Sequence, residues 1–280
     1  MGWTSEIYQS RIADPATRSR HPAGSPCAAE IECYLSACDG VDFNGTALVL
    51  GMTPELRNMA LRNFKRVISV DSSRVAINMF SDWVSEELRG NETVVHGSWA
   101  DPKVFQGREC SVVFGDGISA NLTDYSSALA TLEVIASALA PGGRFVMRNV
   151  LVCSGIVVER FQFGRLLEEF RAGEIDEAEF GFSSRMLGFH DRAYDIEREI
   201  LDCSLVYEHL DRMAAEGLLT EVEAAALSRY RFMGTNYFPR EESWIKLLAA
   251  AGFGAPETHP PRGKLWNEYY PIQSFSPIRD

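Results

Sequence analysis

The fold is decided by the stretch TALVLGMTPELRNMA, residues 46–60. Residues 46–50 form a short, mostly apolar run, which is typical of a strand buried on both faces. After Gly51, Thr53 can cap a helix, and Pro54 suits the first helical turn. Nucleotide-binding α/β domains begin with such a passage from strand to helix at a glycine. The stretch therefore predicts a strand–turn–helix unit with a ligand site at the turn.

The same alternation continues along the chain to residue 152. Further strands are predicted at RVISVD (66–71), TVVHG (93–97), CSVVFGDG (110–117) and RFVMRNVLV (144–152). Helices are predicted over 72–90 and 123–143, each with apolar residues on one face. Strands that alternate with helices predict a doubly wound α/β fold with a mostly parallel, Rossmann-like sheet and right-handed crossovers.

The pattern changes after the fifth strand. Residues 155–238 carry helical periodicity, in which Ile196, Ile200, Cys203, Tyr207 and Leu210 make one apolar line, and Thr220 with Glu223 forms a capping-box pattern. The α/β rhythm returns at 240–253, and 265–275 is predicted as a final strand. We expect an N-terminal arm or lid (1–25), an α/β domain (26–154 and 239–280) and a helical insertion (155–238) that caps a substrate.

The composition of the chain limits which partners it is expected to bind and the compartment in which it is expected to work. The 280 residues are 46% hydrophobic and carry a formal net charge of −12, so nucleic acid is not an expected partner because an acidic chain repels polyphosphate. No apolar run is long enough for a membrane span. The six cysteines form no CxxC pair, which predicts reduced thiols and a cytoplasmic protein. The five histidines show no metal-binding spacing, so no metal is expected.

The turn at Gly51 limits the ligand. A dinucleotide pyrophosphate needs glycine at three positions, which here hold Gly51, Thr53 and Leu56. Two of these glycines are missing, so a diphosphate ligand is disfavoured. Asp71 ends the second strand 20 residues after Gly51, where a carboxylate can accept hydrogen bonds from both hydroxyls of a ribose. The alternative role for Asp71 is to cap the following helix.

Two later turns add to this signal. Ser98 and Trp99 follow the third strand. The short polar Ser98 could contact the edge of an adenine ring and the flat Trp99 could cover its face, although Trp99 also suits a core position. Asp116 follows the fourth strand between Gly115 and Gly117, which let the backbone approach a ligand; the alternative is a solvated glycine turn. Together these turns fit a ligand that has an adenosine and no phosphate.

The order and spacing of these motifs resemble the class I S-adenosylmethionine-dependent methyltransferases over roughly residues 27–152 and 240–275, and LAPGGRFVMRNV (139–150) resembles the helix–turn–strand that follows them in that family. The resemblance implies a seven-stranded sheet and S-adenosyl-L-methionine as cofactor, and the helical pattern of residues 155–238 adds an insertion after the fifth strand. The cofactor-binding residues that it implies are Gly51, Met52, Thr53, Asp71, Ser72, Ser98, Trp99, Asp116 and Gly117.

Methyl transfer is an in-line displacement that needs alignment and exclusion of water, and it needs a base only if the acceptor must lose a proton. Candidate catalytic residues are His21, Asp116 and Arg148, and candidate substrate contacts are Asn121, Asn149, Tyr237 and Arg240. A monomer or homodimer that methylates an O, N or C atom of a small molecule, as in natural-product biosynthesis, is the favoured reading. The alternatives are an enzyme of this fold that uses the cofactor without methyl transfer, and an NAD(P)-dependent oxidoreductase.

Overall fold

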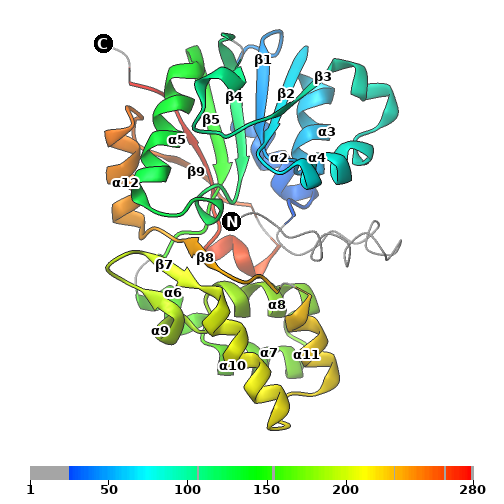
Figure 1. Cartoon of the computed structure of the whole chain (residues 1–280), viewed down its shortest axis with the longest axis vertical. Helices are drawn as coiled ribbons and strands as arrows, with labels where there is room; N and C mark the ends of the chain where they lie inside the picture. Colours follow the sequence, from blue (N-terminus) through cyan, green and yellow to red (C-terminus); the bar gives the residue numbers. More distant parts are fainter. Residues whose placement is uncertain (1–24, 106, 153–154, 230, 262, 279–280) are drawn as a thin grey trace.

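The computed structural model describes residues 25–105, 107–152, 155–229, 231–261 and 263–278. Two lobes are stacked along the long axis of the molecule (Figure 1). One lobe holds the central sheet and its flanking helices, and the other holds the residues inserted after the fifth strand. His21 and nearly all of the predicted arm lie outside the described residues.

Seven strands form the central sheet in the order β3-β2-β1-β4-β5-β10-β9. β1 pairs in parallel with β2 and β4, whereas β10 is antiparallel to both β5 and β9. The predicted seven-stranded, mostly parallel sheet is confirmed. The strand bounds are β1 Thr46–Leu50, β2 Arg66–Asp71, β3 Glu92–His96, β4 Cys110–Asp116, β5 Leu139–Arg148, β9 Glu257–His259 and β10 Ile272–Phe275.

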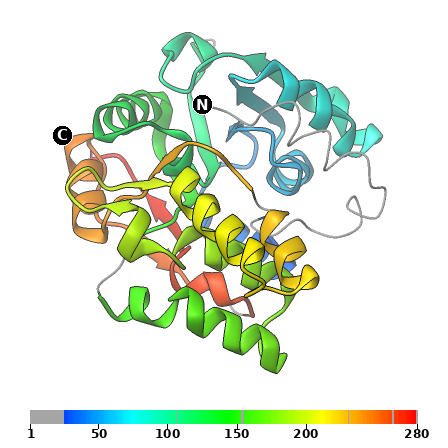
Figure 2. The same ribbon diagram turned by 60° about the horizontal axis from the view of Figure 1, so that its bottom comes forward.

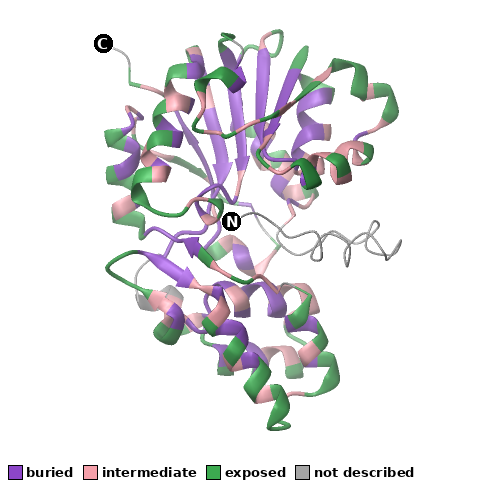
Figure 3. Ribbon diagram, in the orientation of Figure 1, coloured by how far each residue is buried: buried purple, intermediate pink, exposed green. Residues whose placement is uncertain are grey.

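The sheet is covered on both faces because alternate residues of each strand point to opposite sides. In β1, Ala47 and Val49 join an apolar cluster with α2 and α3, while Leu48 and Leu50 join another with α5 and α12. Figure 3 shows the buried strands between helices that are exposed on their outer sides. The helix bounds are α2 Ala28–Ser36, α3 Pro54–Asn63, α4 Arg74–Phe80, α5 Tyr125–Ala138 and α12 Glu241–Ala250, with 3₁₀ turns η1 Ser81–Trp83, η2 Glu86–Asn91, η3 Pro102–Phe105, η4 Ser119–Asn121 and η5 Leu265–Glu268.

The helix predicted over 72–90 was too long. α4 ends at Phe80, and two 3₁₀ turns follow it. Side chains of α3 bind the carbonyls that a longer helix would use: Arg57 Nη1 donates to the Phe80 carbonyl at 2.6 Å, and Asn58 Nδ2 donates to the Trp83 carbonyl at 3.1 Å. These tertiary hydrogen bonds replace helical ones and end the helix.

The insertion packs around an apolar core that it shares with residues of the α/β part, among them Val150, Trp266 and Tyr270, and it lies in front of the sheet when the molecule is turned (Figure 2). The Thr220–Glu223 capping box is confirmed at the start of α11. The insertion is not purely helical, however, because it also contains a three-stranded antiparallel sheet that was not predicted. Its elements are α6 Gly155–Arg160, α7 Phe163–Ala172, α8 Glu177–Met186, α9 His190–Ala193, β6 Tyr194–Asp195, β7 Ile200–Asp202, α10 Cys203–Ala215, α11 Glu221–Ser228 and β8 Thr235–Tyr237.

The missed strands explain why one predicted apolar line was wrong at its start. Ile200 belongs to β7, and Ile196 is exposed in the turn before that strand. The helix that carries the rest of the line, α10, begins only at Cys203, where the Asp202 carboxylate accepts from the backbone N–H of Ser204 at 2.9 Å. A side-chain cap therefore fixes a boundary that the apolar spacing alone did not show.

Glu199 joins the insertion to the first turn of α12. Its φ of +56° lies in the left-handed region, which is uncommon for a residue other than glycine. The buried carboxylate accepts from Arg240 Nε at 2.8 Å, Ser243 Oγ at 2.5 Å and Tyr237 OH at 3.4 Å. These three donors hold the β6–β7 turn against the point where the chain returns to the sheet.

The pair formed by Arg57 and Glu92 yields a test of the fold. Both side chains are almost fully buried, and Nε and Nη2 of the arginine each lie 2.7 Å from a Glu92 carboxylate oxygen. Arg57→Leu strands that carboxylate, so we expect the free energy of unfolding in urea to fall by about 3–5 kcal/mol. Arg62→Leu, an exposed position on the same helix, is the control and should change it by less than about 0.5 kcal/mol. Equal losses in the two variants would contradict this assignment.

Candidate functional site

The turn after β1 brings together three of the residues predicted to bind a cofactor. Gly51 has a φ of +90°, a conformation that favours glycine, and its N–H donates to the Val70 carbonyl at 2.7 Å. A Cβ atom at Gly51 would lie 3.7 Å from Cζ2 of Trp99 and 3.9 Å from Oδ2 of Asp71. Gly51, Asp71 and Trp99 therefore meet at the carboxyl ends of β1 and β2.

Asp71 offers one carboxylate oxygen to this meeting point. Its Oδ1 accepts from the backbone N–H of Ser73 at 2.7 Å, and the cap of α4 is Ser73, whose Oγ accepts from the N–H of Ala76. Burial raises the pKa of Asp71, while the Ser73 N–H and His96 oppose that shift. Oδ2 faces Gly51 and has no hydrogen-bond donor among the described residues, so it can accept from a ligand.

Trp99 is held in place beside this carboxylate. Its indole Nε1 donates to the Val70 carbonyl at 2.9 Å, which fixes the ring over the turn.

The other predicted cofactor residues lie around this turn. Ser98 is exposed. Ser72 is also exposed, and its carbonyl lies 3.0 Å from His96 Nε2. Met52 packs on Ala76 in a small apolar cluster. Thr53 precedes α3 without a capping hydrogen bond from its side chain. The roles of these four residues stay predictions.

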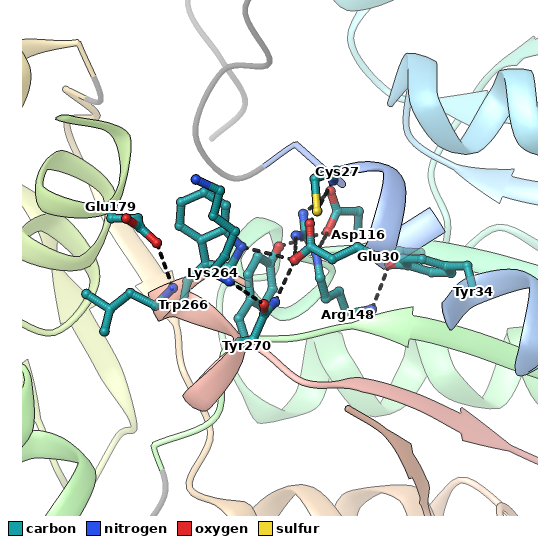
Figure 4. Close-up of polar contacts among 12 residues, drawn as sticks. Cys27, Glu30, Tyr34, Asp116, Arg148, Glu179, Lys264, Trp266 and Tyr270 are labelled. Atoms are coloured by element: carbon teal, nitrogen blue, oxygen red, sulfur yellow. Dashed lines mark hydrogen bonds and ion pairs between the residues drawn. The ribbon is translucent and has the colours of Figure 1, made fainter. Parts of the chain in front are cut away.

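Arg148 and Asp116 lie in a buried network of charges at the carboxyl ends of β4 and β5 (Figure 4). The fully buried guanidinium of Arg148 donates from Nε and Nη2 to the two Asp116 carboxylate oxygens at 2.9 and 3.0 Å. Its Nη1 donates to Oε1 of Glu30 at 2.7 Å. One cation thus stands between two carboxylates, and its Cζ lies 4.3 Å from the centre of the Tyr270 ring.

Glu30, on α2, is the member of this network that the sequence analysis missed. Its Oε1 also accepts from Trp266 Nε1 at 3.0 Å and from Asn267 Nδ2 at 2.8 Å, and its Oε2 accepts from the N–H of Cys27 at 2.7 Å. Burial alone would raise the pKa of Glu30, but Arg148, the Cys27 N–H and the Trp266 indole outweigh burial and lower it. The available signal was a carboxylate on the same helical face as the apolar Tyr34, four residues later.

Two tyrosines fix the backbone around Asp116. The hydroxyl of Tyr34 donates to the Gly115 carbonyl at 2.7 Å and accepts from the N–H of Arg148 at 2.9 Å, so it bridges β4 and β5. The hydroxyl of Tyr270 donates to Asp116 Oδ1 at 3.0 Å. A Cβ at Gly117 would lie only 2.7 Å from that hydroxyl, and Gly117 has a φ of +61°. Burial raises the pKa of Asp116, although Arg148 opposes this shift.

The predicted substrate contacts fall in two places. Asn149 is buried, and its Oδ1 accepts from the N–H and the Oγ of Ser119, while Asn121 is exposed and donates to the Gly117 carbonyl at 2.9 Å. Both lie beside the turn that follows β4.

The other two predicted substrate contacts, Tyr237 and Arg240, instead bind Glu199 at the junction with α12. The functional roles of all four stay predictions, and His21 lies outside the described residues.

Three further features of the described residues bear on the earlier expectations. They contain no group of three His, Cys, Asp or Glu side chains arranged to hold a metal ion. Five cysteines within them are free thiols: Cys27, Cys33, Cys38, Cys110 and Cys203. None of the described helices combines the length and apolar character that crossing a bilayer requires.

The lowered pKa of Glu30 predicts an acid-dependent stability. A carboxyl group with a depressed pKa stabilises the fold above its ordinary value of 4.5, and that stabilisation is lost as the pH falls through the lower folded value. Glu30→Gln should therefore lower the free energy of unfolding at pH 7 by about 1.5–3 kcal/mol, the contribution of hydrogen bonds to a charged group. The gap from the wild-type protein should narrow below pH 4.5.

Urea unfolding at a series of pH values measures this gap. Glu32→Gln, an exposed carboxylate on the same helix, is the matched control and should follow the wild-type curve. A gap that is constant with pH would show that Glu30 acts through packing and not through its charge.

No protein-family model matches the sequence, and no curated protein is similar to it. Solved structures do match in fold. The CcbJ methyltransferase of Streptomyces caelestis has a TM-score of 0.56 at 12% identity over 98% of both chains. The glycopeptide N-methyltransferase MtfA, complexed with S-adenosylmethionine, has a TM-score of 0.53 at 11% identity over 92% of this chain and 96% of its own. A Rhodobacter sphaeroides protein, provisionally named a Zn-dependent alcohol dehydrogenase, has a TM-score of 0.57 at 14% identity over 92% of both.

The order and direction of the strands distinguish the methyltransferase fold from the dinucleotide-binding fold that the name alcohol dehydrogenase suggests. The dinucleotide-binding sheet has six parallel strands in the order 3-2-1-4-5-6. This sheet has seven, and its reversed β10 is inserted between β5 and the edge strand β9. The turn at Gly51 also lacks two of the three glycines of the dinucleotide fingerprint. The chain therefore has the fold of the class I S-adenosylmethionine-dependent methyltransferases.

Proposed function

We propose that this protein is an S-adenosylmethionine-dependent methyltransferase that acts on a small molecule. The observation that carries the proposal is the meeting of Gly51, Asp71 Oδ2 and the Trp99 ring at the carboxyl ends of β1 and β2. Ligands of open parallel sheets bind at this edge. The likeness in fold to CcbJ and MtfA supports the proposal, and MtfA was solved with the cofactor bound.

The residues at this edge fit an adenosine. Asp71 Oδ2 is an acceptor for ribose hydroxyls, and the fixed Trp99 ring gives a flat apolar surface for the base. A pyrophosphate fits less well: Leu56 is fully buried where the dinucleotide fingerprint has glycine, and Pro54 removes one N–H from the first turn of α3. When bound, S-adenosylmethionine would supply a methyl group already activated for transfer.

The chain's own task is then to position the reactants and exclude water. Both oxygens of Asp116 accept hydrogen bonds, from Arg148 and Tyr270, and Arg148 is fully buried. We therefore assign these two predicted catalytic residues to positioning the turn after β4, and not to proton transfer. His21 remains a candidate base. The arm (1–25) and the insertion (155–238) are proposed to cover the acceptor above the sheet.

Asp71→Ala tests the cofactor site. Loss of a hydrogen-bonded carboxylate should weaken binding of S-adenosylhomocysteine by about 1–3 kcal/mol, or roughly 5- to 150-fold in Kd. Isothermal titration calorimetry on the folded variant measures this loss. Asp82→Ala, which removes a highly exposed carboxylate, is the charge-matched control and should leave the affinity unchanged.

A parallel titration with NADH addresses the oxidoreductase alternative. We expect no NADH binding at concentrations that saturate S-adenosylhomocysteine, because the Gly51 turn does not fit a pyrophosphate. Tight NADH binding that is lost in Asp71→Ala would favour the oxidoreductase. Cofactor binding without a methylated product from any acceptor would favour an enzyme that uses the cofactor in another way.

A further inference from the structure

Arg185, on α8 of the insertion, differs from the arginines around it. Most arginines of the insertion pair with a carboxylate, among them Arg160 with Glu169 and Arg171 with Glu223. Arg185 is partly buried, yet it forms no ion pair with any carboxylate among the described residues. The chain has an excess of 12 acidic over basic residues, from 39 Asp and Glu against 27 Lys and Arg, so the lack of a partner does not reflect a shortage of carboxylates.

The guanidinium of Arg185 is held by neutral groups. Its Nη2 donates to Oδ1 of Asn236 at 3.0 Å, and its Cζ lies 5.1 Å from the centre of the Phe232 ring. The neutral thiol of Cys203 also lies beside the guanidinium, but Nε is buried and forms no hydrogen bond with the described residues. A positive charge that is partly withdrawn from water without a counter-ion is unfavourable, and a bound anion would offset that cost.

Two chains of contacts connect Arg185 and its helix to the carboxyl end of β4. Nδ2 of Asn236 donates at 2.6 Å to the carbonyl of Ala120, in the turn just after Gly117. One helical turn before Arg185, the ring of Phe182 lies 5.9 Å from that of Tyr270, whose hydroxyl binds Asp116. Arg185 thus lies on the insertion side of the region where a methyl acceptor would bind.

We propose that Arg185 binds a carboxylate of the acceptor molecule; this inference rests on the proposed methyl transfer for the identity of its ligand. A single guanidinium matches the single charge of a carboxylate. A phosphate carries about −1.5 to −2 charges at pH 7 and finds no second cation beside Arg185 among its described contacts. The partly exposed Phe232 ring beside the guanidinium favours an acceptor whose carboxylate is attached to an apolar or aromatic body.

The test uses benzoate as the probe, titrated by calorimetry into protein saturated with S-adenosylhomocysteine. Benzoate should bind the wild-type protein with a millimolar Kd, and benzamide, its neutral counterpart, should bind at least tenfold more weakly. Arg185→Gln should weaken benzoate binding at least tenfold. Arg198→Gln, an exposed arginine of the same lobe that forms no ion pair with the described carboxylates, is the matched control and should bind benzoate like the wild-type protein.

Two further readouts separate a binding role from a structural one. The melting temperature of ligand-free Arg185→Gln should equal or exceed that of the wild-type protein, because the variant loses an uncompensated charge. Its affinity for S-adenosylhomocysteine should be unchanged. A lower melting temperature together with unchanged benzoate binding would identify a structural residue and overturn the proposal.

The remaining outcomes also decide the matter. Equal binding of benzoate and benzamide, or no benzoate binding by the wild-type protein up to about 10 mM, overturns the carboxylate site. Tighter binding of inorganic phosphate than of benzoate overturns the assignment to a carboxylate. If benzoate shows the same selectivity and the same dependence on Arg185 with ligand-free protein, but the wild-type protein binds no S-adenosylhomocysteine, the methyltransferase proposal fails and the anion site stands.

Discussion

The interaction on which the rest of this structure depends is the burial of the Arg148 guanidinium between Asp116 and Glu30. A buried ion pair is stable only when its geometry is good and its remaining hydrogen bonds are satisfied. Here, Asp116 is bound through both oxygens, and Glu30 gains further donors from Trp266, Asn267 and Cys27. These partners come from α2, β4, β5 and η5, so satisfying one charge joins segments that are far apart in the sequence.

This network also determines the shape of the candidate site. Asp116 can stay at the end of β4 only if Arg148 and Tyr270 hold it there, and Tyr270 in turn leaves no room for a side chain at Gly117. The turn after β4 therefore keeps its backbone close to the sheet edge. The turn after β1 also has a glycine with positive φ, Gly51, and these two turns lie at the carboxyl ends of the adjacent strands β1 and β4.

The parallel part of the sheet could be predicted because each of its strands is marked by residues that lie close together in the sequence. An apolar run, a glycine and a helix cap recur within short windows, and parallel strands place the ends of β1 and β2 side by side, so the proximity of Gly51 and Asp71 follows from the sequence. The antiparallel direction of β10 could not be predicted in this way, because it is set by pairing with β5, which lies more than 100 residues earlier in the sequence. The strands of the insertion are only two or three residues long, too short for a periodic signal.

The charge network shows a second limit on sequence-based prediction. Asp116 stood out because it lies at the end of the predicted fourth strand, and Arg148 because it lies in the predicted fifth strand next to it; the candidate role of each was catalytic. Their burial depends on Glu30, whose carboxylate lies on a helix 118 residues from Arg148 in the sequence. No local pattern shows that three charges so far apart meet in the interior, and without that knowledge a positioning residue cannot be told from a catalytic one.

The buried network and Arg185 place charges of opposite sign on the two lobes beside the candidate site. When both carboxylates are ionised, Glu30, Asp116 and Arg148 carry one net negative charge on the sheet side, and Arg185 carries one positive charge on the insertion side. In the proposed reaction, this arrangement would favour a cationic methyl donor next to the sheet and an anionic acceptor next to the insertion. The charges that would orient each reactant would then also keep the two in the order that the proposed transfer requires.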